Sequence, residues 1–210
     1  MKKLTFCVIA LAVAAPASAR KLSLLPFDTK LSFAPAAPGV IGPAHPFYHH
    51  IEVAPIVGMP EKLGAFLVSY TKRGEVQAAL ERTMADAGML APAGTTPTLR
   101  LTATWIAFDA PQKISFSSHA TVTIRYELSR IPSGDVIFRR DITNQAKASG
   151  GDGAQRLQGT ARSVILASLP SATWCLEQSP LGGAPLDCTL HPVGRIGDPV
   201  KVWMPIRVPR

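Results

Sequence analysis

One segment restricts the fold more than any other. Between residues 116 and 128, apolar and polar side chains alternate. A repeat of two residues places successive side chains on opposite faces, so it predicts a strand with one buried and one solvated face. That division is typical of an antiparallel sheet covered on one side only. The apolar side chains belong to Phe116, Ala120, Val122, Ile124, Tyr126 and Leu128, and the polar ones to Ser117, His119, Thr121, Thr123, Arg125 and Glu127.

Three further strands are predicted, at residues 51–57, 98–107 and 136–143, because each is rich in β-branched or aromatic residues. Pro55 lacks a backbone donor, so we expect the first of them at an edge or at a position that needs no ladder bond. Residues 59–64 are expected to form a loop. In the second strand, one face carries Leu99, Leu101, Ala103 and Trp105, and the other carries Thr98, Arg100, Thr102 and Thr104.

Two helices are predicted from apolar residues that recur at helical spacing. The first covers residues 74–87 and is ended by Gly88, and residues 65–73 are a candidate extension of it. The second covers residues 154–169, and Pro170 is expected to end it because proline interrupts a helix interior.

The resulting order, β-α-β-β-β-α, predicts an α+β fold. We expect a two-layer sandwich in which two helices pack on one face of a four-stranded, largely antiparallel sheet. This domain covers residues 51–170. Residues 20–50 form a segment rich in proline and alanine that lies along it, and residues 171–210 form a tail with one strand-like run near its end.

The register of the hairpin around residues 132–134 also follows from the pattern. Both flanking strands bury even-numbered residues, so the loop must hold an odd number of residues. A three-residue loop places Glu127 opposite Asp141, which destabilises. A five-residue loop pairs Glu127 with Arg139 and Arg125 with Asp141, and each such pair contributes about 0.2–1 kcal/mol. We therefore predict a loop of residues 131–135, which also pairs Leu128 with Phe138 and Ile124 with Ile142, and sets Arg140 beside Tyr126 on the inner face.

The first 19 residues have the three parts of a bacterial secretory signal peptide in order. Lys2 and Lys3 precede an apolar run at residues 4–15, and an A-x-A cleavage site follows at residues 17–19. The run is too short for a membrane helix, which needs about 20 residues. Cys7 lies too early for lipidation. We expect a soluble periplasmic protein that begins at Arg20, with association with the outer membrane as a further option. An uncleaved N-terminal anchor is the alternative.

Cleavage leaves 191 of the 210 residues, enough for one domain, and lowers the formal net charge from +8 to +6. The excess positive charge is spread thinly along the chain, which suits weak attraction to an anionic envelope component. A nucleic-acid partner is not expected, since the chain has no basic helix or recognised binding motif. Nothing in the sequence indicates the oligomeric state.

Two cysteines remain after cleavage, Cys175 and Cys188. In an oxidising compartment, an even pair this close predicts a disulfide that tethers the tail. The alternatives are two free thiols, or a metal site that includes His191; the latter lacks the further cysteine of a tetrahedral set.

Other groups with chemical potential are weaker candidates. His45, His49 and His50 cluster before the first strand, but a solvated loop explains them better than a metal site. His119 lies near Ser117, but the sequence has no nucleophile elbow. The loop at residues 149–153 precedes a helix but lacks the P-loop lysine, and Asp152 is better explained as a helix cap. We therefore predict no catalytic, metal-binding or cofactor-binding residue and no cofactor.

Three stretches carry a family resemblance: "ALERTMADAGML", "SFSSHATVTIRYELSRIPSGDVIFRRDI" and "GDGAQRLQGTARSVILASL". They resemble a class of small bacterial envelope proteins described as lipoproteins of unknown function. The element order is similar, more loosely, to that of the YajG lipoproteins and of LptE, the plug of the lipopolysaccharide translocon. The resemblance covers residues 51–170 and implies an envelope location. It brings no catalytic residue, and Arg20 stands where lipoproteins carry their lipid-bearing cysteine.

The function expected is non-enzymatic: contact with a partner protein or another envelope component. A flat sheet face would favour this hypothesis. The alternative is a periplasmic enzyme or small-ligand binder with a site under the N-terminal segment, which a deep, polar-lined pocket would favour. The predicted contact face is the polar side of the sheet, formed by Arg100, Thr102, Thr104, His119, Thr121, Thr123 and Arg125.

Overall fold

The structure is a computed structural model, and it describes residues 32–33, 40–65, 68–110, 115–149, 153–179, 188, 191–193 and 201–203. The predicted signal peptide, Asp152 and most of the tail lie outside these ranges. The strands are β1 (Ser32–Phe33), β2 (Ile51–Val53), β3 (Lys62–Ala65), β4 (Val68–Lys72), β5 (Leu99–Asp109), β6 (Ser117–Arg130), β7 (Val136–Ser149), β8 (His191–Val193) and β9 (Lys201–Trp203). The helices are α1 (Arg73–Asp86) and α2 (Gly153–Gln178).

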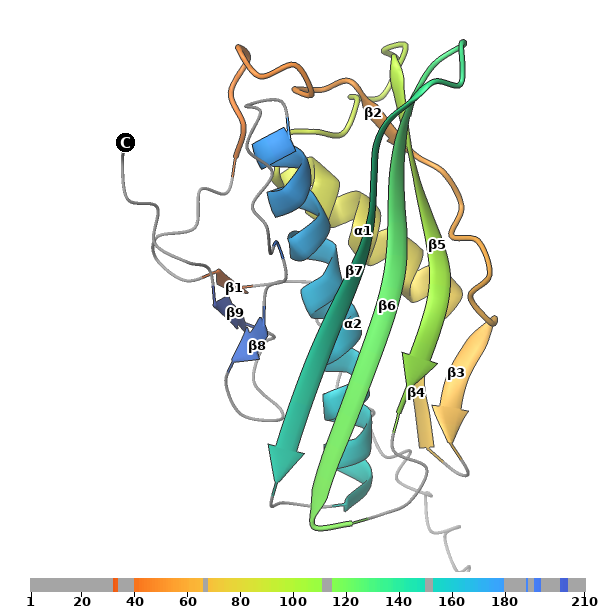
Figure 1. Cartoon of the computed structure of the whole chain (residues 1–210), viewed down its shortest axis with the longest axis vertical. Coiled ribbons are helices and arrows are strands. Elements are labelled where there is room, and N and C mark those ends of the chain that lie inside the picture. Colours follow the sequence, from red (N-terminus) through yellow and green to blue (C-terminus); the bar gives the residue numbers. More distant parts are fainter. Residues whose placement is uncertain are drawn as a thin grey trace, which may run out of the picture.

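The main sheet has four strands in the order β2-β5-β6-β7, and both helices lie on the same side of it (Figure 1). β2 is parallel to β5, and the other neighbours are antiparallel. Every even-numbered residue of β6 from Ser118 to Leu128 is buried, as the alternation predicts. The expected α+β sandwich is therefore confirmed. Phe116 was expected on the buried face but precedes the strand and is 93% exposed.

The β6–β7 hairpin has the predicted register. Glu127 pairs with Arg139, Arg125 with Asp141, and Leu128 with Phe138. The strands are joined by the five residues 131–135. One feature next to this loop was not predicted: Ser129 pairs with Val136, so the register shifts and Ile137 has no partner residue. This irregularity is a β-bulge, which redirects a side chain at the end of a strand.

Helix α2 continues through Pro170 to Gln178, so the prediction that Pro170 ends the helix is wrong. Proline in a helix interior costs about 3 kcal/mol. Burial of the following turns offsets that cost, because Cys175 and Leu176 are fully buried and a buried leucine contributes about 1.5–3 kcal/mol. α2 packs against β6, β7 and α1 (Figure 1). No helix in the described part of the chain has the length and hydropathy needed to cross a bilayer.

Upstream of α1, strands β3 and β4 form an antiparallel hairpin. This differs from the predicted loop and helical extension, because tertiary pairing overrode a weak local pattern. A Cβ at Gly64 would lie only 2.6 Å from the Val68 carbonyl oxygen, so the close approach of the two strands requires glycine there. α1 begins where the Glu75 carboxylate accepts the Lys72 N–H at 3.1 Å. It ends before Gly88, whose positive φ of 74° is typical of a helix C-terminus, as predicted.

The third sheet joins the two ends of the chain in the order β1-β9-β8. β1 comes from the proline-rich segment and occupies an edge, and β9 lies within the strand-like run of the tail. Beside this sheet, Cys175 and Cys188 form the predicted disulfide, with 5.4 Å between their Cα atoms. The Nη1 atom of Arg140 lies 3.4 Å from the Cys188 sulfur, so this inner-face arginine extends toward the disulfide.

Candidate functional site

The outer face of the main sheet is the side away from the helices, and no described helix or strand covers it (Figure 1). All seven residues of the predicted contact face lie on this side, in β5 and β6. Strand pairing brings them together: Thr104 lies opposite Arg125, and Thr102 lies opposite Glu127. The seven are Arg100, Thr102, Thr104, His119, Thr121, Thr123 and Arg125.

Ion pairs between neighbouring strands cross this outer face. Arg125 binds Asp141 through two hydrogen bonds, Nε to Oδ1 at 2.7 Å and Nη2 to Oδ2 at 2.9 Å. Further pairs join Arg100 to Glu52, with 2.5 Å between Nε and Oε1, and Arg139 to Glu127. Bidentate geometry fixes both partners of the Arg125 pair more firmly than a single contact does.

The Arg125 pair changes the titration of both its members. The hydrogen bond from Arg125 lowers the pKa of the Asp141 carboxyl, and the charges of Arg125 and Arg139 act in the same direction. In return, the hydrogen bond to Asp141 and the charge of that carboxylate raise the pKa of Arg125. Both groups therefore remain ionised over a wider pH range than isolated side chains would.

The charges on the described outer face are balanced. Its cations are matched by an equal number of carboxylates, so the face is polar without being a cationic surface. The sequence prediction named Arg100 and Arg125 for this face but left out the carboxylates that pair with them. The hairpin register placed Asp141 beside Arg125, but Glu52 lies beside Arg100 through the parallel β2–β5 pairing, which the sequence did not predict. The cations are Arg100, Arg125, Arg139 and Lys147, and the anions are Glu52, Asp109, Glu127 and Asp141.

The histidine side chains make different contacts. His45 Nδ1 accepts the Phe47 N–H at 3.2 Å, and its Nε2 lies 3.3 Å from the Glu177 carbonyl oxygen, so its ring joins the N-terminal segment to the end of α2. The His49 ring stacks on Tyr48. His119 Nε2 lies 3.3 Å from the Thr121 hydroxyl. Within the described ranges, no three histidine, cysteine or acidic side chains are grouped as metal ligands.

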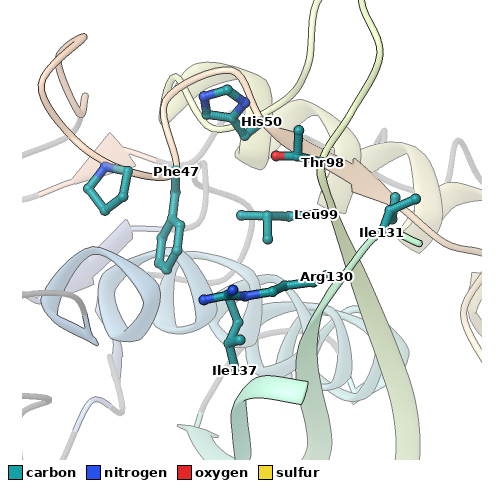
Figure 2. Close-up of a pocket in the computed structure, with 8 residues that line it drawn as sticks. Phe47, His50, Thr98, Leu99, Arg130, Ile131 and Ile137 are labelled. Carbon is teal, nitrogen blue, oxygen red and sulfur yellow. The ribbon is translucent and has the colours of Figure 1, made fainter. Parts of the chain in front are cut away.

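A pocket of about 370 Å³ lies at the end of the main sheet, beneath residues 46–50. It is wide open to solvent and has both apolar and polar lining, so it is not the deep, polar-lined site that would favour an enzyme. Figure 2 shows the Arg130 side chain extending past Leu99 toward Phe47 and Ile137. The lining residues are Pro46, Phe47, His50, Thr98, Leu99, Arg130, Ile131 and Ile137. None of them belongs to the predicted contact face.

Comparison with known proteins gives a fold and no sequence family. No family model matches the sequence, and no curated protein matches it. Among solved structures, protein XCC0632 from Xanthomonas campestris, of family model DUF330, is 12% identical over 73% of this chain and 97% of that chain, with a TM-score of 0.51. A candidate lipoprotein from Caulobacter crescentus is 11% identical over 66% of this chain and 95% of that chain, with a TM-score of 0.44. Protein CT253 from Chlamydia trachomatis is 11% identical over 63% of this chain and 98% of that chain, with a TM-score of 0.43. The chain therefore shares its overall fold with XCC0632.

Proposed function

We propose that this chain is an exported cell-envelope protein that binds a partner protein through the outer face of its main sheet. The observation that carries the proposal is the set of cross-strand ion pairs on a face that no described element covers. Most of the inner face of the same sheet is covered by the helices and belongs to the core.

The paired charges make this face suitable for burial. An unpaired charge enclosed in an interface is costly, and breaking a buried pair costs about 3–5 kcal/mol. Here Arg125, Arg139 and Arg100 already have carboxylate partners within the sheet, so a partner can cover them without stranding a charge. The hydroxyls of Thr123 and Thr143, 2.9 Å apart, add donors and acceptors for the interface.

Two observations support the envelope location. The first is the order of charged, apolar and small residues in the predicted signal peptide. The second is the Cys175–Cys188 disulfide, since disulfides persist mainly in oxidising compartments outside the cytoplasm. The resemblance to small envelope proteins agrees with this location.

The proposal can be tested by placing a photo-crosslinking amino acid at Thr123, in the centre of the outer face, in cells that make the protein. The same probe at Asp86, an exposed residue at the end of α1, is the matched control. We expect one discrete protein adduct from Thr123 and none of that mass from Asp86. Identical adducts from both positions, or no adduct from Thr123, would contradict the proposal.

Charge variants then test whether the ion pair matters to the contact. Asp141→Asn strands Arg125 and should reduce the yield of the Thr123 adduct. Combining Arg125→Asp with Asp141→Arg keeps an ion pair at this position of the sheet, so the fold should be preserved. Circular dichroism of each variant separates loss of contact from loss of structure. An adduct yield that is the same in D141N and in the wild type would argue against contact at this pair.

A further inference from the structure

The pocket at the end of the main sheet combines apolar walls with a cation. Phe47 and Leu99 are buried and form its inner part, while Ile131 and Ile137 line the side toward the β6–β7 loop. Ile137, which has no partner residue in β6 because of the β-bulge, lines this pocket. The bulge therefore supplies an apolar wall that a regular hairpin would not place there.

Backbone hydrogen bonds fix the walls of the pocket relative to one another. The N–H groups of Thr98 and Leu99 both donate to the His50 carbonyl, at 3.1 Å each. The Ile131 N–H donates to the Thr98 carbonyl at 2.8 Å. The turn at residues 46–50, the start of β5 and the end of β6 are thus tied together, so the pocket is formed before any ligand arrives.

Arg130 is the distinctive residue of the pocket. It lies opposite Leu99 in the β5–β6 pairing, so it shares the inner face of the sheet, which is mostly apolar. Five arginines of the described chain have a carboxylate within ion-pair distance, and Arg130 is not among them. Arg130 is exposed at the mouth of the pocket, beside apolar walls, so its guanidinium can form charge-assisted hydrogen bonds with an anion supplied from outside.

We propose that this pocket binds an amphiphilic anion, a molecule with a carboxylate or phosphate group and an apolar body. Its anionic oxygens bind the Arg130 guanidinium, which suits two oxygens held side by side. The apolar body packs against Phe47, Leu99 and Ile137, and His50 and Thr98 lie at the polar rim (Figure 2). At about 30 Å³ for each water-sized group, the pocket holds roughly a dozen non-hydrogen atoms. This inference does not depend on the sheet-face contact, so either proposal can fail while the other stands.

Titration calorimetry of the purified chain with four decyl probes tests the proposal. Decanoate and decyl phosphate carry the two anionic groups, 1-decanol is neutral, and decyltrimethylammonium is a cation. We expect saturable binding of at least one anion and weaker binding of the other two probes. The better anion identifies carboxylate or phosphate as the preferred group. Acetate and inorganic phosphate should bind far more weakly, because they lack the apolar body.

Variants locate the binding. Arg130→Gln should weaken binding of the anion about tenfold or more, as expected for loss of a charge-assisted hydrogen bond. Ile137→Asp should also weaken it by adding a like charge to the apolar wall. Arg82→Gln, on the exposed side of α1, is the matched control and should leave the affinity unchanged. Thermal unfolding of each variant verifies that the fold is intact.

Several results would overturn the proposal: no saturable binding of either anion, equal binding of the decyl cation, or equal effects of R130Q and R82Q. A fourth is ligand-induced NMR shifts confined to residues outside the pocket. The crosslinking at Thr123 is read separately, because Thr123 does not line the pocket.

Discussion

A side-chain amide on α1 completes the backbone hydrogen bonding around Pro55. Gln77 Oε1 accepts the Ile56 N–H at 3.0 Å, and Gln77 Nε2 donates to the Ala54 carbonyl at 3.4 Å. These two backbone groups follow β2, where the chain leaves regular pairing and returns to β5 only at Val57. Because β2 ends at Val53, Pro55 lies beyond the strand and needs no N–H to donate to the ladder, as expected. The partner on α1 was not predictable, because it depends on tertiary placement.

Gln77→Leu should therefore lower the free energy of unfolding by about 1–3 kcal/mol, because it leaves the Ile56 N–H without its acceptor. Urea denaturation followed by circular dichroism measures the change. Gln145→Leu, at an exposed position of β7, is the control and should have little effect. Equal effects of the two substitutions would contradict the role assigned to Gln77.

The Asp141 carboxyl makes stability depend on pH. Its pKa is lowered in the folded protein, so its contribution is present above the unfolded value of about 3.9 and is lost as the pH falls through the folded value. Asp141→Asn should lower the free energy of unfolding at pH 7 by up to about 1 kcal/mol, as expected for an exposed pair. Unfolding curves for both proteins should converge as the pH falls below about 4. A difference that persists undiminished at pH 2 would argue against this assignment.

Among the secondary-structure elements, those with long, regular patterns were predicted best. The alternation of β5, β6 and β7 gave their faces and, through residue parity, the hairpin register. Short elements were missed: the β3–β4 hairpin has no distinctive local pattern. The end of α2 was also misplaced, because the local penalty of Pro170 was outweighed by burial of residues that the sequence had assigned to the tail.

Leu176→Ala tests the extension of α2 beyond Pro170. Leu176 is fully buried, so its truncation should lower the free energy of unfolding by about 2–5 kcal/mol. Val57→Ala, at a 52% exposed position, should cost much less. Chemical denaturation of the two variants gives the comparison. If Leu176→Ala were as mild as Val57→Ala, the last turns of α2 would not be part of the core.

For the molecule as a whole, the disulfide connects α2 to the tail across 13 residues. In the chain-entropy model, closing a loop of this size stabilises the folded state by about 3 kcal/mol. Replacing both Cys175 and Cys188 by serine should lower the free energy of unfolding by about that amount, measured by denaturant titration. A reducing agent should reproduce the loss in the wild type and have no effect on the double variant. Equal sensitivity of both proteins to the reductant would refute the assignment.

The sequence predicted one candidate site, the outer face, but not the other, the pocket. Membership of the outer face followed from the alternation of polar residues along each strand. The pocket did not, because its lining comes from the N-terminal segment, the three strands β5, β6 and β7, and the loop between β6 and β7. Only tertiary structure brings Phe47 beside Arg130. Arg130 continues the even-numbered, inward-facing series of β6 beyond Leu128, and this charge in an inward-facing position is a sequence signal that could have indicated the pocket.

The parallel pairing of β2 with β5 has a consequence for the order of folding. The β6–β7 ion pairs join residues 12 and 16 positions apart, whereas Glu52 and Arg100 are separated by 48. Contacts between distant residues form later, because closing the longer loop costs more entropy. We therefore expect the β5-β6-β7 meander to form first and β2 to join it last. Until then, one edge of β5 is open to pairing with other chains, and the charge of Arg100 on that edge discourages such aggregation.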